Sequence, residues 1–96
     1  MNTDKKTEEF YKKLKKDLAY DTLWPADYLF KFIVPSDQEK IQQVGETFNN
    51  LGAVITTKVS SKGNFTSVSV LVRMENPDAV IEKYQAVSGI EGIISL

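Results

Sequence analysis

The sequence predicts an α+β fold in which strands and helices follow one another as β-α-β-β-α-β, behind one extra N-terminal helix. Two runs rich in β-branched residues flank a polar link with Gly63 and Asn64, which is typical of a β-hairpin. One strand and one helical pattern precede this hairpin, and another helix and a short strand follow it. Since the two halves are alike and such crossovers are right-handed, we expect a ferredoxin-like two-layer sandwich with an antiparallel sheet in the order 4-1-3-2.

The composition narrows the function before any motif is considered. The 96 residues suit a single main domain, and the 12 basic and 13 acidic side chains nearly cancel, so we expect neither nucleic acid nor a membrane as a partner. Cysteine and histidine are absent, which excludes disulfides, thiolate and imidazole metal sites, and the Ser-His-Asp and Cys-His catalytic groups. We therefore expect no metal, no cofactor and no enzymatic activity.

Nothing in the sequence predicts export or membrane insertion. No apolar run reaches the roughly 18 residues of a membrane span, and the charged N-terminus lacks the apolar segment of a signal peptide. Because the absence of cysteine also suits a reducing compartment, we expect a cytoplasmic protein.

An N-terminal helix is predicted over residues 3–20, outside a main domain at residues 24–96. Phe10, Leu14 and Leu18 recur at four-residue spacing among lysines and acids, which gives a narrow apolar stripe. Residues 1–23 thus form a helical arm and a connector. The arm either docks on the domain or remains a solvated helix.

The first strand of the domain is predicted over Tyr28–Val34 by its strict alternation. Phe30 and Phe32 then share one face, and Lys31 lies on the other. We assign the aromatic face to the core, because the opposite choice would bury the charge of Lys31 beneath the helices. Pro35 ends this strand.

Both helices of the domain carry capping signals. Ser36 and Glu39 match a capping box at the start of a helix over residues 37–50. Asn76 and Pro77 are typical of the start of a second helix, which ends near residue 89. The predicted buried stripes are Ile41, Val44, Phe48 and Leu51 in the first helix, and Val80, Tyr84 and Val87 in the second, with Ile81 alongside.

The hairpin strands are predicted at residues 53–60 and 65–74. The second run alternates cleanly, so its valines and Met74 should face the core. Its other face carries Ser67, Ser69, Leu71 and Arg73. A short final strand at residues 90–96, interrupted by Gly92, completes the sheet.

With both main helices on one side of the sheet, the other side is an open face, and we expect it to be the working surface. It should combine Leu29, Lys31, Ile33, Ser67, Ser69, Leu71 and Arg73 with Ile93 or Ile94. Four exposed aliphatic side chains form a sizeable patch for a monomer, which indicates a covering element or a partner. Either the stripe of the N-terminal helix covers part of this face, or two chains pack there.

The hairpin resembles that of a known family. The run Ser60-Ser61-Lys62-Gly63-Asn64-Phe65, followed by Ser-Val-Ser-Val, is similar to the Ser-Ser-Lys-Gly-Asn-Tyr and Ser-Val pattern of the YbeD-like family of small, functionally uncharacterised bacterial proteins. The resemblance covers residues 24–96, and the first strand agrees with it through Pro25, Tyr28, Phe30 and Lys31. It implies a fold similar to ACT regulatory domains, with no catalytic residues to carry over. The glycine turn of the ACT ligand site is missing from the link at residues 34–37.

Two groups of polar residues are candidate ligand sites. In the hairpin loop, Ser61, Lys62, Gly63 and Asn64 could present donors to an anion, although a glycine and an asparagine there also serve simply to reverse the chain. On the open face, Lys31 and Arg73 could hold a carboxylate or phosphate. Alternatively, they keep the sheet solvated, with Arg73 paired to Asp27.

RNA-recognition domains share this topology, but they need stacking aromatic side chains on the two central strands. The corresponding positions are Asn64 and Thr66, or Phe65 and Ser67 after a one-residue shift, so we do not expect RNA binding. The sequence therefore predicts an ACT-like regulatory or interaction module that works through the open face, as a homodimer or with another protein. The alternative is a small-molecule or anion sensor that uses Lys31, Arg73 and the loop at residues 60–64.

Overall fold

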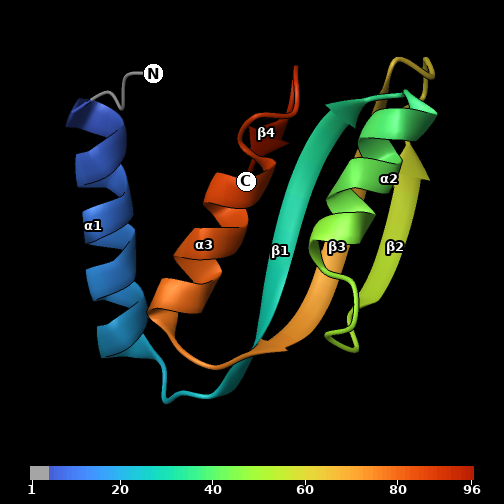
Figure 1. Cartoon of the computed structure of the whole chain (residues 1–96). Helices are drawn as coiled ribbons and strands as arrows, with labels where there is room; N and C mark the ends of the chain where they lie inside the picture. Colours follow the sequence, from blue (N-terminus) through green and yellow to red (C-terminus); the bar gives the residue numbers. More distant parts are fainter. Residues whose placement is uncertain (1–4) are drawn as a thin grey trace.

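The structure is a computed structural model that describes residues 5–96, and its elements follow the predicted order (Figure 1). Their bounds are α1 Lys5–Asp21, β1 Ala26–Pro35, α2 Gln38–Thr47, β2 Val54–Val59, β3 Phe65–Met74, α3 Pro77–Val87 and β4 Ile94–Ser95. The strands form one antiparallel sheet in the order β2-β3-β1-β4. The predicted ferredoxin-like α+β fold, with its sheet order and its extra helix, is therefore confirmed.

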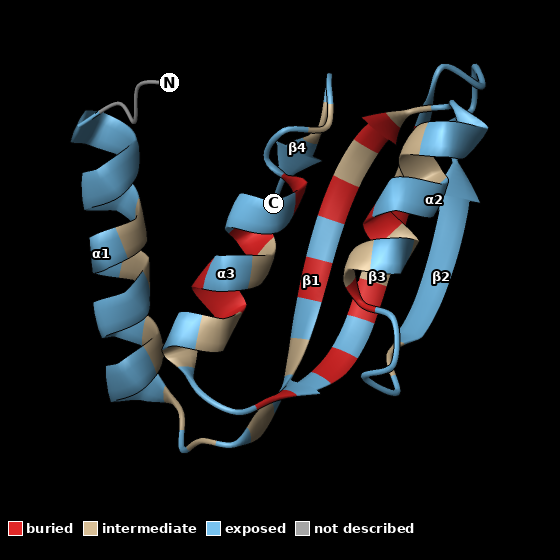
Figure 2. Ribbon diagram, in the orientation of Figure 1, coloured by how far each residue is buried: buried red, intermediate tan, exposed pale blue. Residues whose placement is uncertain are grey.

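The core lies between the sheet and the helices α2 and α3. Phe30 and Phe32 of β1 are fully buried, and the valines of β3 lie beside them. Figure 2 shows the resulting alternation of buried and exposed residues along β1 and β3. The helices contribute Val44, Phe48, Val80, Tyr84 and Val87. The predicted inward and outward faces of the central strands are thus correct.

The cap of α2 differs from the predicted capping box. Asp37, not Ser36, is the N-cap, and its carboxylate accepts a hydrogen bond from the Glu39 amide at 2.9 Å. The Ser36 hydroxyl instead forms a hydrogen bond of 2.8 Å with the hydroxyl of Thr66. Thr66 is a polar residue on the core face of β3 and only 2% exposed, so it needs this partner.

Two predicted element ends are also corrected. The helix predicted to run to residue 50 ends at Thr47, and the left-handed exit lies in the following turn, where Asn50 has φ 65° and Gly52 has φ 72°. The last strand is only Ile94–Ser95, because residues 90–93 form turns instead. In these turns the Ile93 amide donates to the Ile90 carbonyl at 3.2 Å.

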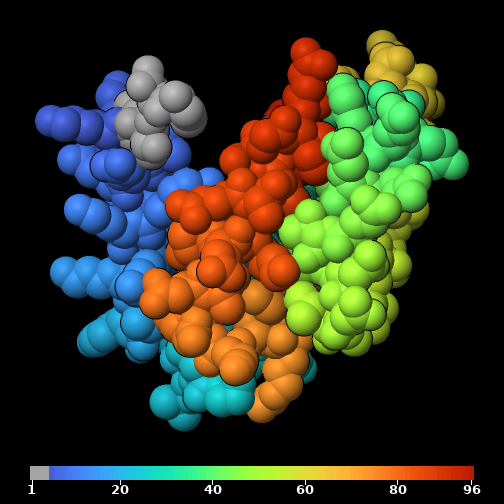
Figure 3. All heavy atoms as spheres, viewed as in Figure 1, coloured from blue at the N-terminus to red at the C-terminus, as the bar shows by residue number. Residues whose placement is uncertain are grey.

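The helix α1 packs beside α3 and does not cover the open face. Figure 3 shows α1 next to α3 on the side of the molecule that carries the helices. Tyr11, Leu14 and Leu18 pack against the core, whereas Phe10 is 62% exposed. The predicted covering of the open face by this helix is therefore wrong. The predicted start at Thr3 lies outside the described residues.

The side of α3 explains where α1 docks. Ile81 lies on the side of α3 away from the sheet and is 9% exposed. Together with Tyr11 of α1, it borders a surface hollow. The edge strand β4 has only two residues, so the sheet alone would leave this side of α3 bare. The Trp24 indole fixes the end of α1 by donating to the Leu18 carbonyl at 3.0 Å.

Candidate functional site

The open face is a grid of side chains that the strand register sets in rows. Between β1 and β3, Leu29 lies opposite Leu71, Lys31 opposite Ser69, and Ile33 opposite Ser67. The neighbouring strands extend these rows with Val54, Thr56 and Lys58 from β2 and Ile94 from β4. An apolar row, a polar row and a mixed row therefore follow one another along the strands.

Two apolar patches on this face are exposed to solvent. The first is a row of Leu29, Leu71 and Val54, whose exposed fractions are 52%, 46% and 60%. The second consists of Ile33, Ile94 and Phe65 at the other end of the face. The row of Lys31, Ser69 and Thr56 separates them. No helix among residues 5–96 covers either patch, so both remain available to a partner.

Three members of these patches were missing from the predicted open face or left undecided. Phe65 continues the alternation of β3 by one step, so the sequence signal for it was present. Val54 could not be placed, because its row depends on the register between β2 and β3. Of the two alternatives for the last strand, Ile94 is on the face, and Ile93 packs against the core.

Lys31 and Arg73 are not brought together. Arg73 lies opposite Asp27, and its Nη1 is 3.8 Å from the Asp27 Oδ1, with both side chains exposed. Lys31 is opposite Ser69, four residues from Arg73 along β3, or roughly 13 Å at the usual rise per residue. The two cations are therefore separate surface charges, and the exposed Arg73–Asp27 pair contributes at most about 1 kcal/mol.

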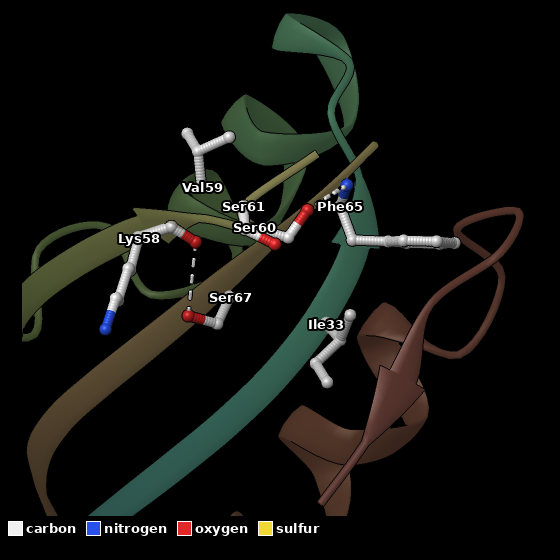
Figure 4. A pocket seen from close by; sticks show the side chains of 7 residues that line it. All are labelled: Ile33, Lys58, Val59, Ser60, Ser61, Phe65 and Ser67. Carbon is white, nitrogen blue, oxygen red and sulfur yellow. Dashed lines mark hydrogen bonds between the residues drawn. The ribbon is translucent and has the colours of Figure 1, made fainter. Parts of the chain in front are cut away.

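The residues at the end of the hairpin border a hollow of about 350 Å³ (Figure 4). It is lined by Ile33, Lys58, Val59, Ser60, Ser61, Phe65 and Ser67. Two of its hydroxyls already serve the fold, since Ser60 Oγ accepts from the Phe65 amide at 3.2 Å and Ser67 Oγ donates to the Lys58 carbonyl at 3.3 Å. The hollow therefore offers an apolar wall with few free polar groups.

The backbone groups of the loop form hydrogen bonds that stabilise the turn. Gly63 has φ 80°, and its amide donates to the Ser60 carbonyl at 2.9 Å. The Asn64 carbonyl accepts from the Ser36 amide at 3.0 Å. Lys62 and Ser61 are exposed beside a smaller hollow of about 240 Å³. This geometry favours the turn-forming role of the loop over a converging set of amides for an anion.

A further hollow of about 290 Å³, which the sequence did not predict, lies where α1 meets the domain. It is lined by Phe10, Tyr11, Leu14, Tyr28, Tyr84, Ser95 and Leu96. The hydroxyls of Tyr28 and Tyr84 share a hydrogen bond of 2.9 Å. Burial raises the pKa of Tyr84, and the hydrogen bond to Tyr28 raises it further, so this phenol stays protonated at neutral pH. Tyr84 thus forms a packing and hydrogen-bonding contact at the wall of this hollow.

Two other site classes find no support in the described residues. Among residues 5–96, no three Asp or Glu side chains are grouped so that they could hold a metal ion. Within the same range, none of the helices combines the length and the hydropathy needed to cross a membrane.

Comparisons with known proteins agree with this fold. A family described as "Protein of unknown function (DUF493)" matches residues 21–96. Among curated proteins, no match was found. A solved structure, the ACT domain from GTP pyrophosphokinase of Chlorobium tepidum, aligns with a TM-score of 0.51 and 13% identity over 74% of this chain and 100% of that one. At this identity the likeness concerns the fold alone.

Proposed function

Because the chain belongs to the DUF493 family of proteins of unknown function, we propose its role from its own surface: a regulatory or interaction module without catalytic activity. Its working surface is the open face. The observation that supports this is the row of Leu29, Leu71 and Val54, one residue from each of three neighbouring strands and each about half exposed. An apolar row of this kind on an uncovered sheet is the usual mark of a protein contact.

A partner surface complementary to the open face would have two apolar regions, one for each patch, with polar groups between them. The row of Lys31, Ser69 and Thr56 separates the two apolar patches and would supply hydrogen-bond donors and acceptors to such a partner. A second copy of the chain and a different protein both meet this description. The ACT-like fold fits a regulatory role, and the hairpin residues fit membership of the YbeD-like group. We expect the module to act in the cytoplasm.

Variants on the open face test this proposal. Leu71→Asp places a carboxylate in the middle of the apolar row, and Lys31→Glu reverses the charge of the polar row. Lys13→Glu makes the same charge reversal on α1, away from the face, and is the matched control. We expect Leu71→Asp to weaken association with a second copy or with a purified partner by at least about tenfold, and Lys13→Glu to leave it unchanged.

Sedimentation equilibrium from about 10 μM to about 1 mM measures the self-association, and calorimetry measures binding to a partner isolated with the wild-type chain. If the association constants of wild type and Leu71→Asp agree within error, the open face is not the contact surface. A wild-type chain that binds neither a second copy nor any partner would contradict the proposed role itself.

The hairpin hollow supports a second candidate, a small-molecule sensor. Ile33 and Phe65 give this hollow an apolar wall, and Figure 4 shows Lys58 and the serines around it. A ligand at 100 times its dissociation constant would add about 2.7 kcal/mol to the free energy of unfolding. A thermal-shift screen with amino acids and inorganic phosphate, repeated with Lys58→Ala and Ser61→Ala, tests this candidate. The absence of any shift in the wild type would exclude those ligands.

A further inference from the structure

Every residue of the strand β2 is exposed, and no strand among residues 5–96 pairs with its outer edge. All six residues of Val54–Val59 are exposed, on both faces of the sheet (Figure 2), although five of them are β-branched. In the sheet β2 pairs with β3, and α2 packs mainly over β1 and β3 and reaches β2 near Ile55. A β-branched edge strand with one charge and no proline is a template for another strand.

The register fixes which backbone groups of β2 point to this free edge. The Ser60 amide donates to the Phe65 carbonyl at 2.7 Å, so these two residues form a hydrogen-bonded pair of the antiparallel ladder. Hydrogen-bonded and non-hydrogen-bonded pairs alternate, so every second residue back along β2 also bonds to β3. Ile55, Thr57 and Val59 therefore direct their amides and carbonyls to the free edge.

We propose that β2 of a second copy of this chain pairs antiparallel with this edge, around a twofold axis at Thr57. In this register Thr57 lies opposite Thr57 of the second copy, and Ile55 lies opposite Val59. The free backbone groups of all three residues are then satisfied on both strands. The two Ile55–Val59 pairs form on the helix side of the sheet, next to α2, where Ile55 Cδ1 is 3.9 Å from the position of a Cβ on Gly45.

The other side chains of β2 favour this register over its neighbours. Lys58 lies opposite Thr56 of the second copy, so the two ammonium groups do not face each other. A shift by one pair in one direction would place Lys58 opposite Lys58, where like charges repel. The opposite shift would match the free backbone groups of only Ile55 and Thr57. A net charge of −1 adds little repulsion between copies.

This pairing joins two sheets into one and places their open faces side by side. It goes beyond the proposed function, because the second copy binds at the edge of the sheet and the apolar rows of both open faces stay free for the proposed contact. The contact itself uses the edge of β2, whereas the proposed function uses the face. Different residues therefore test the two ideas.

Single cysteines test the pairing in the full chain, which has no cysteine of its own. In the proposed register the two Thr57 Cα atoms are about 5.5 Å apart, within disulfide range, so Thr57→Cys should form a covalent dimer rapidly under mild oxidation. Ile55→Cys and Val59→Cys share the same strand face and are exposed, but each would lie roughly 14 Å from its own copy. Each alone should crosslink slowly, and an equal mixture of the two should crosslink rapidly.

Equal rates for all three variants would indicate random collision and overturn the inference, as would the absence of a covalent dimer.

A non-covalent test uses Thr57→Pro, which removes an amide hydrogen from the free edge and leaves the β3 ladder intact. We expect it to weaken dimerisation by at least about tenfold, with an unchanged circular dichroism spectrum. If Leu71→Asp abolishes partner binding but Thr57→Cys does not crosslink, the edge pairing fails and the proposed function stands. If Thr57→Cys crosslinks and Leu71→Asp changes nothing, the reverse holds.

Discussion

Phe48 gives the sharpest test of the core described above, because its ring joins α2 to the aromatic face of β1. The ring is 2% exposed, and its centre lies 4.9 Å from that of Phe30 and 6.2 Å from that of Phe32. On the outer side, the Lys83 ammonium is 5.8 Å from the ring centre and donates to the Thr47 carbonyl at 2.9 Å. We expect Phe48→Ala to lower the free energy of unfolding by about 3 to 5 kcal/mol.

The upper part of that range applies because the neighbours cannot move to fill the cavity. Phe30 and Phe32 are held on a central strand that pairs on both sides, so the lost ring leaves a void. Since a domain of this size is stable by roughly 5 to 15 kcal/mol, the loss is a large share of the total. Urea unfolding followed by the fluorescence of the single tryptophan measures it.

Leu51→Ala is the control for this experiment. Leu51 comes three residues later in the same turn but is 42% exposed, so its truncation should cost less than about 1 kcal/mol. This expectation also corrects the predicted stripe, in which Leu51 was a buried member. A loss of less than about 1 kcal/mol for Phe48→Ala would refute the placement of α2 on the sheet.

Three further outcomes follow from the geometry. Gly92→Ala should lower the free energy of unfolding in urea by more than about 1 kcal/mol, because φ is 83° and a Cβ would lie 2.8 Å from the ring of Pro35. Gly89→Ala is the control, because a Cβ there would meet open space, and it should change the same free energy by less than about 0.5 kcal/mol. Because burial raises the pKa of Tyr84, the phenol loses its proton above about pH 10 in the unfolded chain but keeps it in the folded one. The free energy of unfolding should therefore fall by up to about 1.4 kcal/mol per pH unit above that pH, and Tyr84→Phe should reduce this slope. The Lys15–Asp78 pair, 2.8 Å long but exposed, should lose its small contribution when salt is added, so Lys15→Ala should change the melting temperature little at high salt.

The sheet could be predicted because its signals are local. Alternation along β1 and β3 identified the buried face, and the Lys31 charge decided which face it was. The Asn76 cap with Pro77 located the start of α3 correctly, and its side chain accepts from the Ala79 amide at 2.8 Å. These features depend on neighbours in the sequence, so residue chemistry alone suffices.

The rest depends on contacts between distant parts of the chain. Ser36 did not cap α2 because Thr66, thirty residues away, competes for its hydroxyl. The docking of α1 could not be predicted without knowing that the sheet leaves the apolar side of α3 at Ile81 for another element to cover. Likewise, the row that joins Leu29, Leu71 and Val54 exists only once two strand registers are known. The candidate site was therefore recognised as a face but not as a pattern of rows.

The exposure of β2 on both faces affects how readily the hairpin opens locally. In a lone copy this strand is held by its ladder to β3 with little apolar surface removed from water, so its local opening should require much less free energy than separation of β3 from β1. Amide hydrogens of Thr56 and Lys58 should then exchange with deuterium sooner than those of Val70 and Phe30. The strand β2 should therefore be the part of the hairpin that opens most readily, until another strand pairs with its free edge.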